Sequence, residues 1–328
     1  MPHKVDAGGR RLIVGLARWA LGFAIVGFLL LRFDFRAIAG AVQHADLRIA
    51  ALALFGLVAV HLLGAVAWHQ LSIRLADVRL PWWPTITHYY AAQAVGSVTP
   101  ANLGADAYRL AAVRTAEGGW GTLLLPIVVQ RVTSYVALSV VSLAALVLLP
   151  SSFSTRLLVL SGVGLTVVSF AVLVLVRRPH LAAGLLRRLP QRMRPGPRGP
   201  ALPTRKWTAA LTSGIGLGLA FHMGSIGMVY LLVLALGGSG NAGPILASIA
   251  VARLSILIPL SPSGLGFQEA ALSVLFLQIG LTAEMALATA LLNRVALLGT
   301  MALGAAFVVS GQTGTLRATA KGLTQPTA

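Results

Sequence analysis

Apolar residues in this chain gather into blocks about 20 residues long, and these blocks limit the fold more than any other feature. The blocks cover roughly 12–33, 47–73, 121–149, 156–176, 207–237 and 284–312. A helix of about 20 apolar residues matches the hydrocarbon core of a bilayer. Only 10% of the 328 residues are charged, whereas about a quarter of a soluble globular chain is charged. The sequence therefore predicts an all-α, multi-pass membrane protein with about six full transmembrane helices, in which residues 1–320 form a single membrane domain.

Positive charge predicts the orientation of these helices. The chain has 26 basic and 8 acidic residues. In a soluble protein such an excess would indicate nucleic acid binding, but here it lies between the apolar blocks, as cytoplasmic loops do. The segment 177–206 has nine basic residues, six prolines and no acidic residue. We interpret it as a cytoplasmic loop that lies against anionic headgroups, or that docks a lipid-modifying or glycosyltransferase partner. We expect the cytoplasmic (inner) membrane, both termini in the cytoplasm, and no nucleic acid partner.

Two further apolar stretches, 84–114 and 244–281, are broken by proline and glycine. Counting the crossings places both ends of the first stretch in the cytoplasm and both ends of the second stretch outside. Each stretch is therefore predicted to be a re-entrant hairpin, in which two short helices meet part-way across the membrane. We expect the glycines to permit a tight turn and a close approach of the two helices. The predicted breaks are Pro100 and Gly104 in the first stretch, and Pro259, Pro262, Gly264 and Gly266 in the second.

The two halves of the chain also match each other in sequence. The run Pro-Ala-Asn-Leu-Gly that begins at Pro100 corresponds to Pro-Ser-Gly-Leu-Gly at Pro262, an offset of 162 residues. An acidic residue and an arginine then follow each run with an offset of 163: Asp106 matches Glu269, and Arg131 matches Arg294. We therefore predict two inverted repeats, 47–149 and 207–312. Inverted repeats with broken helices near the midplane are typical of transporters.

Charged residues inside the predicted hydrocarbon region are the candidate functional residues, because each needs a partner or a water-filled cavity. One interpretation is an internal ion pair in each repeat. In the other interpretation, the arginines bind an anionic headgroup, since the planar guanidinium suits phosphate. The acids would then balance the arginine charge or carry a proton. The candidates for substrate binding or translocation are Asp106, Arg109, Arg131, Arg253, Glu269 and Arg294.

Catalytic and metal-binding signatures are missing from the sequence. The chain has no cysteine, which excludes disulfides, thiol nucleophiles and Cys-ligated metals. Its histidines do not form a metal-binding spacing, and no stretch resembles a nucleophile elbow or a P-loop. We therefore expect no catalytic residue, no metal and no cofactor, and we favour a transporter over an enzyme.

The run Ile-Pro-Leu-Ser-Pro-Ser-Gly-Leu-Gly-Phe-Gln-Glu at 258–269, with Arg294 downstream, resembles the flippase-like transmembrane domain of the lysylphosphatidylglycerol synthase family. The run from Pro100 to Arg109, with Arg131 downstream, is similar to that family's earlier motif. The resemblance spans about 12–312. It departs from the family pattern at Ser263-Gly264, where two glycines are expected, and at Gln268, where the family has arginine.

This resemblance implies a membrane protein that translocates an anionic, aminoacylated or polyprenyl-phosphate-linked lipid between leaflets. In the full synthases a soluble aminoacyltransferase domain follows the membrane part. No such segment follows residue 312 here, so we expect a stand-alone member of the family. Two alternatives stay open. One is a membrane enzyme of aminoacyl-lipid or glycolipid synthesis, similar to a phosphatidylglycerol lysyltransferase. The other is an accessory subunit that holds such an enzyme through the segment 177–206.

Overall fold

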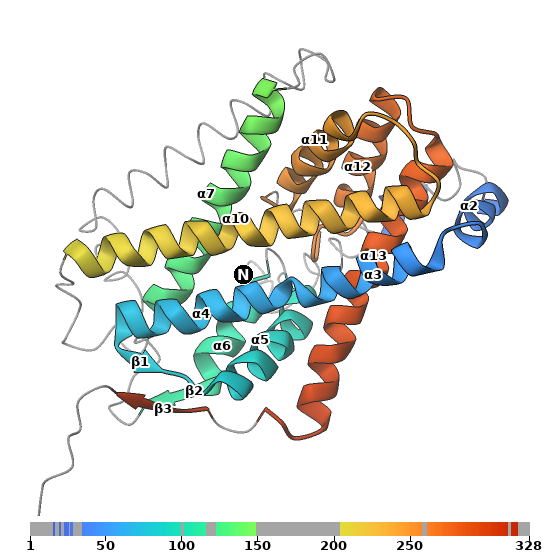
Figure 1. The fold of residues 1–328 in the computed structure, drawn as a ribbon. Helices are drawn as coiled ribbons and strands as arrows, with labels where there is room; N and C mark the ends of the chain where they lie inside the picture. Colours follow the sequence, from blue (N-terminus) through green and yellow to red (C-terminus); the bar gives the residue numbers. More distant parts are fainter. Residues whose placement is uncertain are drawn as a thin grey trace, which may run out of the picture.

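A computed structural model describes most of the chain between residues 35 and 320. The described residues are 35–99, 102–115, 123–148, 204–257, 261–313 and 316–320, with isolated positions between 16 and 28. The predicted helices 12–33 and 156–176 and nearly all of the basic segment 177–206 lie outside these ranges or almost entirely so, as do Pro100 and Pro259. The described residues are largely helical (Figure 1).

Four helices in the described part of the chain are long and apolar enough to cross a membrane. Their bounds are Leu47–Ala76, Leu124–Leu148 (α7), Lys206–Ala235 and Ala283–Val309 (α13). The first contains α3 (Leu47–Ala59) and α4 (His61–Ala76), and the third lies within α10 (Thr204–Ala235). These helices confirm four of the predicted spans, and the chain is a multi-pass membrane protein. The total of six spans stays a prediction.

The basic segment ends earlier than predicted. We expected a loop up to residue 206, but α10 begins at Thr204, so the last three residues of that segment are helical. The apolar pattern misses this turn because a membrane helix extends into the headgroup region, where basic residues are favourable. Lys206 uses this position to form an ion pair with Asp77, 3.0 Å from Nζ to Oδ1.

Each broken apolar stretch forms a pair of short helices. The first helix pair is α5 (Trp82–Ser97) and α6 (Leu103–Ala112). The second helix pair is α11 (Ala242–Ala252), continued by the 3-10 turn η3 (Arg253–Leu257), and α12 (Phe267–Gln278). At 1.5 Å per residue, α6 and α12 are about 15 and 18 Å long. A hydrocarbon core is about 30 Å thick, so these lengths favour re-entry, which itself stays a prediction.

A small sheet shows that the first helix pair begins and ends at the same end of the molecule. Strand β1 (Val78–Arg79) directly precedes this helix pair, and β2 (Val113–Thr115) directly follows it. Both strands pair with β3 (Leu316–Ala320), β1 in antiparallel and β2 in parallel orientation. The all-α prediction did not include these strands, because each is short and β3 follows the last apolar block.

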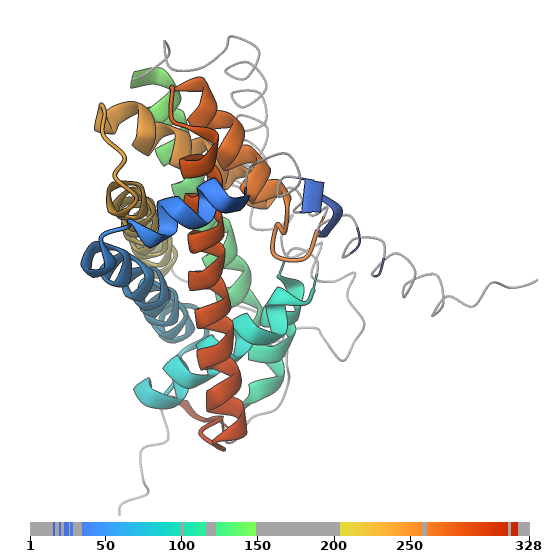
Figure 2. The same ribbon diagram turned by 90° about the vertical axis from the view of Figure 1, so that its right-hand side faces the viewer.

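The second helix pair lies at the opposite end of the molecule (Figures 1 and 2). The start of α3 also reaches this end, where the backbone N–H of Asp46 donates to the carbonyl of Ala235 at 2.8 Å. Before α3 runs one more helix, α2 (Phe35–Gln43). The order of long helix, short helix pair and long helix thus occurs twice, with the short pairs at opposite ends. Inverted repeats require this order, although the repeat relation itself stays a prediction.

The two ends can be assigned to membrane faces by labelling single cysteines, because the chain has no native cysteine. Ser239 is exposed between α10 and α11, and Gln312 is exposed after α13. In intact cells an impermeant thiol reagent should label Ser239→Cys and should label Gln312→Cys only after the membrane is opened. Val98→Cys at the end of α5 should stay unlabelled or react slowly, because a re-entrant tip is shielded. Rapid labelling of Val98→Cys in intact cells would show that the first helix pair crosses the membrane twice.

Candidate functional site

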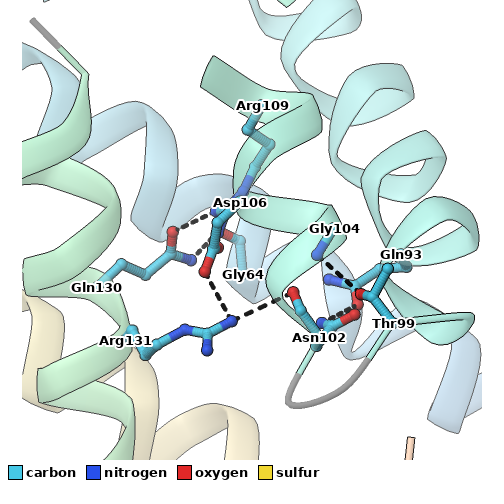
Figure 3. Close-up of polar contacts among 9 residues, drawn as sticks. All are labelled: Gly64, Gln93, Thr99, Asn102, Gly104, Asp106, Arg109, Gln130 and Arg131. Atoms are coloured by element: carbon cyan, nitrogen blue, oxygen red, sulfur yellow. Dashed lines mark hydrogen bonds and ion pairs between the residues drawn. The ribbon is translucent and has the colours of Figure 1, made fainter. Parts of the chain in front are cut away.

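Asp106 in the first turn of α6 holds two arginines at once (Figure 3). Its Oδ1 lies 2.5 Å from Nη2 of Arg109 on the same helix, and its Oδ2 lies 2.7 Å from Nη2 of Arg131 on α7. The pair of Asp106 with Arg131 confirms one of the two predicted ion pairs. These three residues, called the first charged centre below, join the first helix pair to a long membrane helix and carry a formal charge of one positive unit.

Arg109 is fully engaged by the protein. Its Nη1 donates to Oε1 of Gln130 at 2.7 Å, and Nε2 of Gln130 donates in turn to the carbonyl of Gly64 at 2.8 Å. Its guanidinium carbon lies 5.5 Å from the ring centre of Trp68 and 5.5 Å from that of Tyr89, both within the range of cation–π attraction. Such contacts make Arg109 a structural anchor of α6 rather than a group that is open to a ligand.

Arg131 is the more accessible cation of the first charged centre. Its side chain is 24% exposed, whereas that of Arg109 is 9% exposed. Besides Asp106, its Nη2 donates to the backbone carbonyl of Asn102 at 3.3 Å. A headgroup that approached the first charged centre would therefore meet Arg131 first.

Asn102 forms the turn of the first helix pair, where we predicted Gly104. Asn102 has a φ of +56°, whereas Gly104 lies inside α6 with ordinary helical geometry. Asparagine tolerates the left-handed region better than other residues that carry a Cβ. Gly104 instead allows a close approach, because a Cβ there would lie 2.8 Å from the side chain of Thr99. The Oγ1 of Thr99 accepts from the Gly104 N–H at 2.8 Å and donates to the Gly96 carbonyl at 2.7 Å, which satisfies backbone groups at the break.

The second charged centre consists of Glu269 on α12 and Arg294 on α13. Oε1 of Glu269 lies 2.5 Å from Nε of Arg294, which confirms the second predicted ion pair. The side chains are 4% and 14% exposed, so both are withdrawn from solvent. Oε2 of Glu269 also accepts from the backbone N–H of Gly266 at 2.8 Å, and Nη1 of Arg294 donates to the carbonyl of Ser263 at 3.2 Å.

The turn of the second helix pair uses glycine as predicted. Gly264 and Gly266 have φ values of +66° and +81°, a region that is open to glycine at little cost. Ser263 also lies in the left-handed region, with φ of +47°. Pro262 is buried at the start of this turn, and the hydroxyl of the preceding Ser261 donates to the Leu265 carbonyl at 2.7 Å.

The two charged centres share one design that the sequence did not reveal. In each, an arginine on a long helix pairs with an acid in the first turn of a short helix, and the same arginine donates to the carbonyl of a left-handed residue at the break. Asn102 plays this part in one half and Ser263 in the other. The offset of 163 residues located the ion pairs, but a backbone carbonyl leaves no signal in side-chain identity.

The turns of the two helix pairs touch each other. The hydroxyl of Ser263 donates to the backbone carbonyl of Ser97 at 3.1 Å, although the two residues are 166 positions apart. Figures 1 and 2 show that the pairs come from opposite ends of the molecule toward its middle. The two charged centres are therefore neighbours through their turns.

Arg253 belongs to neither charged centre. It opens η3 between α11 and the second turn, and no hydrogen bond or ion pair of its side chain is present among the described residues. It lies instead within electrostatic range of His61 on α4 and His222 on α10. Across the part of the chain that the structure describes, no cluster of three or more His, Asp or Glu residues could hold a metal ion.

The family can be assigned from a sequence comparison, now that the site is described. The family model for the lysylphosphatidylglycerol synthase TM region matches residues 15–304. The chain belongs to this family. The match includes both charged centres and both helix pairs, and it confirms the family that the motifs indicated. Comparison with curated proteins gives no match. The family links the chain to lipid modification or lipid transport in membranes.

The second charged centre should behave as a coupled pair. Glu269→Gln should lower the free energy of unfolding in detergent by about 3–5 kcal/mol, because it leaves Arg294 as an uncompensated buried charge. Adding Arg294→Gln should restore part of this loss, which thermal or denaturant unfolding of all four variants would measure.

The ion pair of Asp77 with Lys206 provides the matched control, because its side chains are 51% and 46% exposed. Asp77→Asn should change the free energy of unfolding by no more than about 1 kcal/mol. Strict additivity of the Glu269 and Arg294 losses would show that these two residues do not interact.

Proposed function

We propose that this protein is a flippase-like transporter that moves an anionic, aminoacylated or polyprenyl-phosphate-linked lipid between the leaflets of the cytoplasmic membrane. The observation that carries the proposal is the meeting of two charged helix breaks between long apolar helices. Buried charge and broken backbone inside a bilayer are costly, and proteins keep them where a polar substrate has to pass. The family match supports a lipid as that substrate.

In this proposal the two helix pairs are re-entrant and enter from opposite faces, with both chain termini in the cytoplasm. The short lengths of α6 and α12 support re-entry, as does the sheet that joins both ends of the first helix pair. The helices α6 and α12 begin at the breaks, so their positive N-terminal ends face the region where the turns meet. This potential favours an anionic headgroup at that depth.

The charge of the two centres gives an order to the binding steps. The first charged centre carries one positive unit, because Asp106 balances only one of its two arginines. The second charged centre is neutral, with one acid and one arginine. An anionic headgroup is therefore attracted more strongly to the first centre, where it competes with Asp106 for Arg131. Attraction between the headgroup and Arg131 is strong here, because the effective dielectric constant is lower than in water.

A pocket next to the first charged centre supports this order. It has a volume of about 320 Å³ and is lined by apolar and small residues of α4, α7 and α10, together with Tyr89, Ser134 and Gln130. Gln130 is the partner of Arg109, so the pocket reaches the hydrogen-bond network of this centre. Its mixture of apolar wall and few polar groups is typical of small-molecule sites. In the proposal, this pocket admits the part of the lipid next to the charged headgroup.

The basic segment 177–206 is proposed to lie on the cytoplasmic face. There it would contact anionic headgroups or a lipid-modifying or glycosyltransferase partner. Its nine basic residues and six prolines support this role.

The role of the arginines can be separated from their charge. Arg131→Lys and Arg294→Lys keep the charge but lose the planar fork that donates two parallel hydrogen bonds, so lipid transport should fall about tenfold or more. Insertion and thermal stability should remain close to wild type. A leaflet-resolved assay in proteoliposomes, run over a panel of labelled lipids, measures the transport rate.

Arg48→Lys is the control for these variants, because Arg48 is exposed at the start of α3. It should transport at the wild-type rate. Wild-type transport by Arg294→Lys would remove the headgroup role of that residue. Transfer of an aminoacyl group from tRNA to lipid by the purified protein, without lipid movement, would favour an enzyme instead.

A further inference from the structure

Arg253 lies where the membrane protein has no acid left to balance it. The two acids of the hairpin breaks are already bound, Asp106 to Arg109 and Arg131, and Glu269 to Arg294. Among the described residues, the partly buried Arg253 guanidinium has no carboxylate and no hydrogen-bond acceptor. A cation in the interior of a membrane protein is unfavourable unless it is paired, hydrated or bound to a ligand. Its position therefore calls for an anion that the protein itself does not supply.

Two histidines on the facing long helices share this environment. His61 and His222 both lie within electrostatic range of Arg253. The ring of Phe221 stands edge-on to both, with centroid distances of 5.5 Å to His61 and 5.2 Å to His222. Arg253, His61 and His222, called the central basic cluster below, thus come from η3, α4 and α10 and include no acidic residue.

His222 carries a buried nitrogen without a partner. The residue is only 6% exposed, and its Nδ1 makes no hydrogen bond. Its Nε2 lies 3.2 Å from the hydroxyl and 3.1 Å from the carbonyl of Ser134 on α7. If the Ser134 hydroxyl donates to Nε2, the neutral ring carries its proton on Nδ1 and can donate to an anion. A buried donor without an acceptor is rare in proteins and indicates a missing partner.

We propose that the central basic cluster is a phosphate-binding site, distinct from the two charged centres, that receives the phosphate group of the lipid during its passage. Arg253 is the main ligand, because its planar guanidinium can donate two parallel hydrogen bonds to phosphate oxygens. His222 adds the Nδ1–H donor. This proposal rests on the proposed function and names the chemical group that the transported lipid must carry.

The position of Ser134 links this site to the first charged centre. Ser134 follows Arg131 by three residues on α7, so the two side chains lie on the same face of that helix. Arg131 thus leads through Ser134 and His222 to the surroundings of Arg253. In the proposal, a phosphate that leaves Arg131 finds its next cation at Arg253 before it reaches Arg294.

The test uses thermal unfolding of the purified full-length protein in a neutral detergent. Three probes are compared at equal concentrations: short-chain phosphatidylglycerol, short-chain diacylglycerol, which lacks phosphate, and inorganic phosphate. Phosphatidylglycerol should raise the Tm of the wild type in a saturable manner, and diacylglycerol should not. Arg253→Gln should weaken the apparent affinity for phosphatidylglycerol about tenfold or more, and Arg253→Lys should weaken it by less. His222→Gln, which removes the ring Nδ1–H, should also weaken it.

The stability without lipid separates this site from a structural ion pair. Arg253→Gln removes an unbalanced charge, so its Tm without lipid should equal or exceed that of the wild type. Arg48→Gln, on the exposed start of α3, should change neither quantity.

An unchanged lipid affinity in both Arg253 variants would overturn the proposal, as would a fall in lipid-free Tm as large as that of Glu269→Gln. An equal Tm shift with inorganic phosphate would identify a free anion as the occupant and overturn the lipid assignment. Failure of the wild type to transport lipid would contradict the proposed function and leave this binding result independent of it.

Discussion

A helix break inside a membrane creates two demands, and in this protein one arginine meets both of them in each half. The break leaves backbone carbonyls without partners, and no water is available in hydrocarbon to bind them. Arg131 and Arg294 each donate to such a carbonyl, at Asn102 and Ser263, and each is balanced by the acid one turn further along. Removing either acid would leave a charge unpaired and would also loosen the turn that the arginine holds. The position of both short helix pairs depends on this arrangement.

The two halves are similar but do not carry the same charge. The first half has an additional arginine, Arg109, which is held by Gln130 and two aromatic rings, whereas its counterpart by offset in the second half is Leu272. The second half has Arg253, for which the offset gives Ala91 in the first half. Each half therefore contains one cation that the other lacks. One is locked into the packing of α6, and the other stands beside two histidines without an acid.

Much of this arrangement could be predicted from the sequence, because hydropathy and charge leave strong signals in a membrane protein. The apolar blocks gave four of the long helices, and the constant offset paired Asp106 with Arg131 and Glu269 with Arg294. Contacts to backbone atoms could not be predicted, since any residue can supply a carbonyl. For this reason the turn was assigned to Gly104 instead of Asn102, and the contact between the two turns was missed. The strand β3 was missed because short edge strands have no distinctive pattern of side chains.

The small sheet at one end of the molecule makes the two halves mechanically unequal. Strand β3, which follows the last long helix, is bonded to the entrance and to the exit of the first helix pair. The outer ends of that pair are thereby tied to α13, a helix of the other half. If the halves rock against each other, the first helix pair must pivot about this fixed base, and its displacement is largest at the turn near Asn102. A cycle of this kind would work like a lever with one clamped end, in which strain gathers at the tip that meets Ser263.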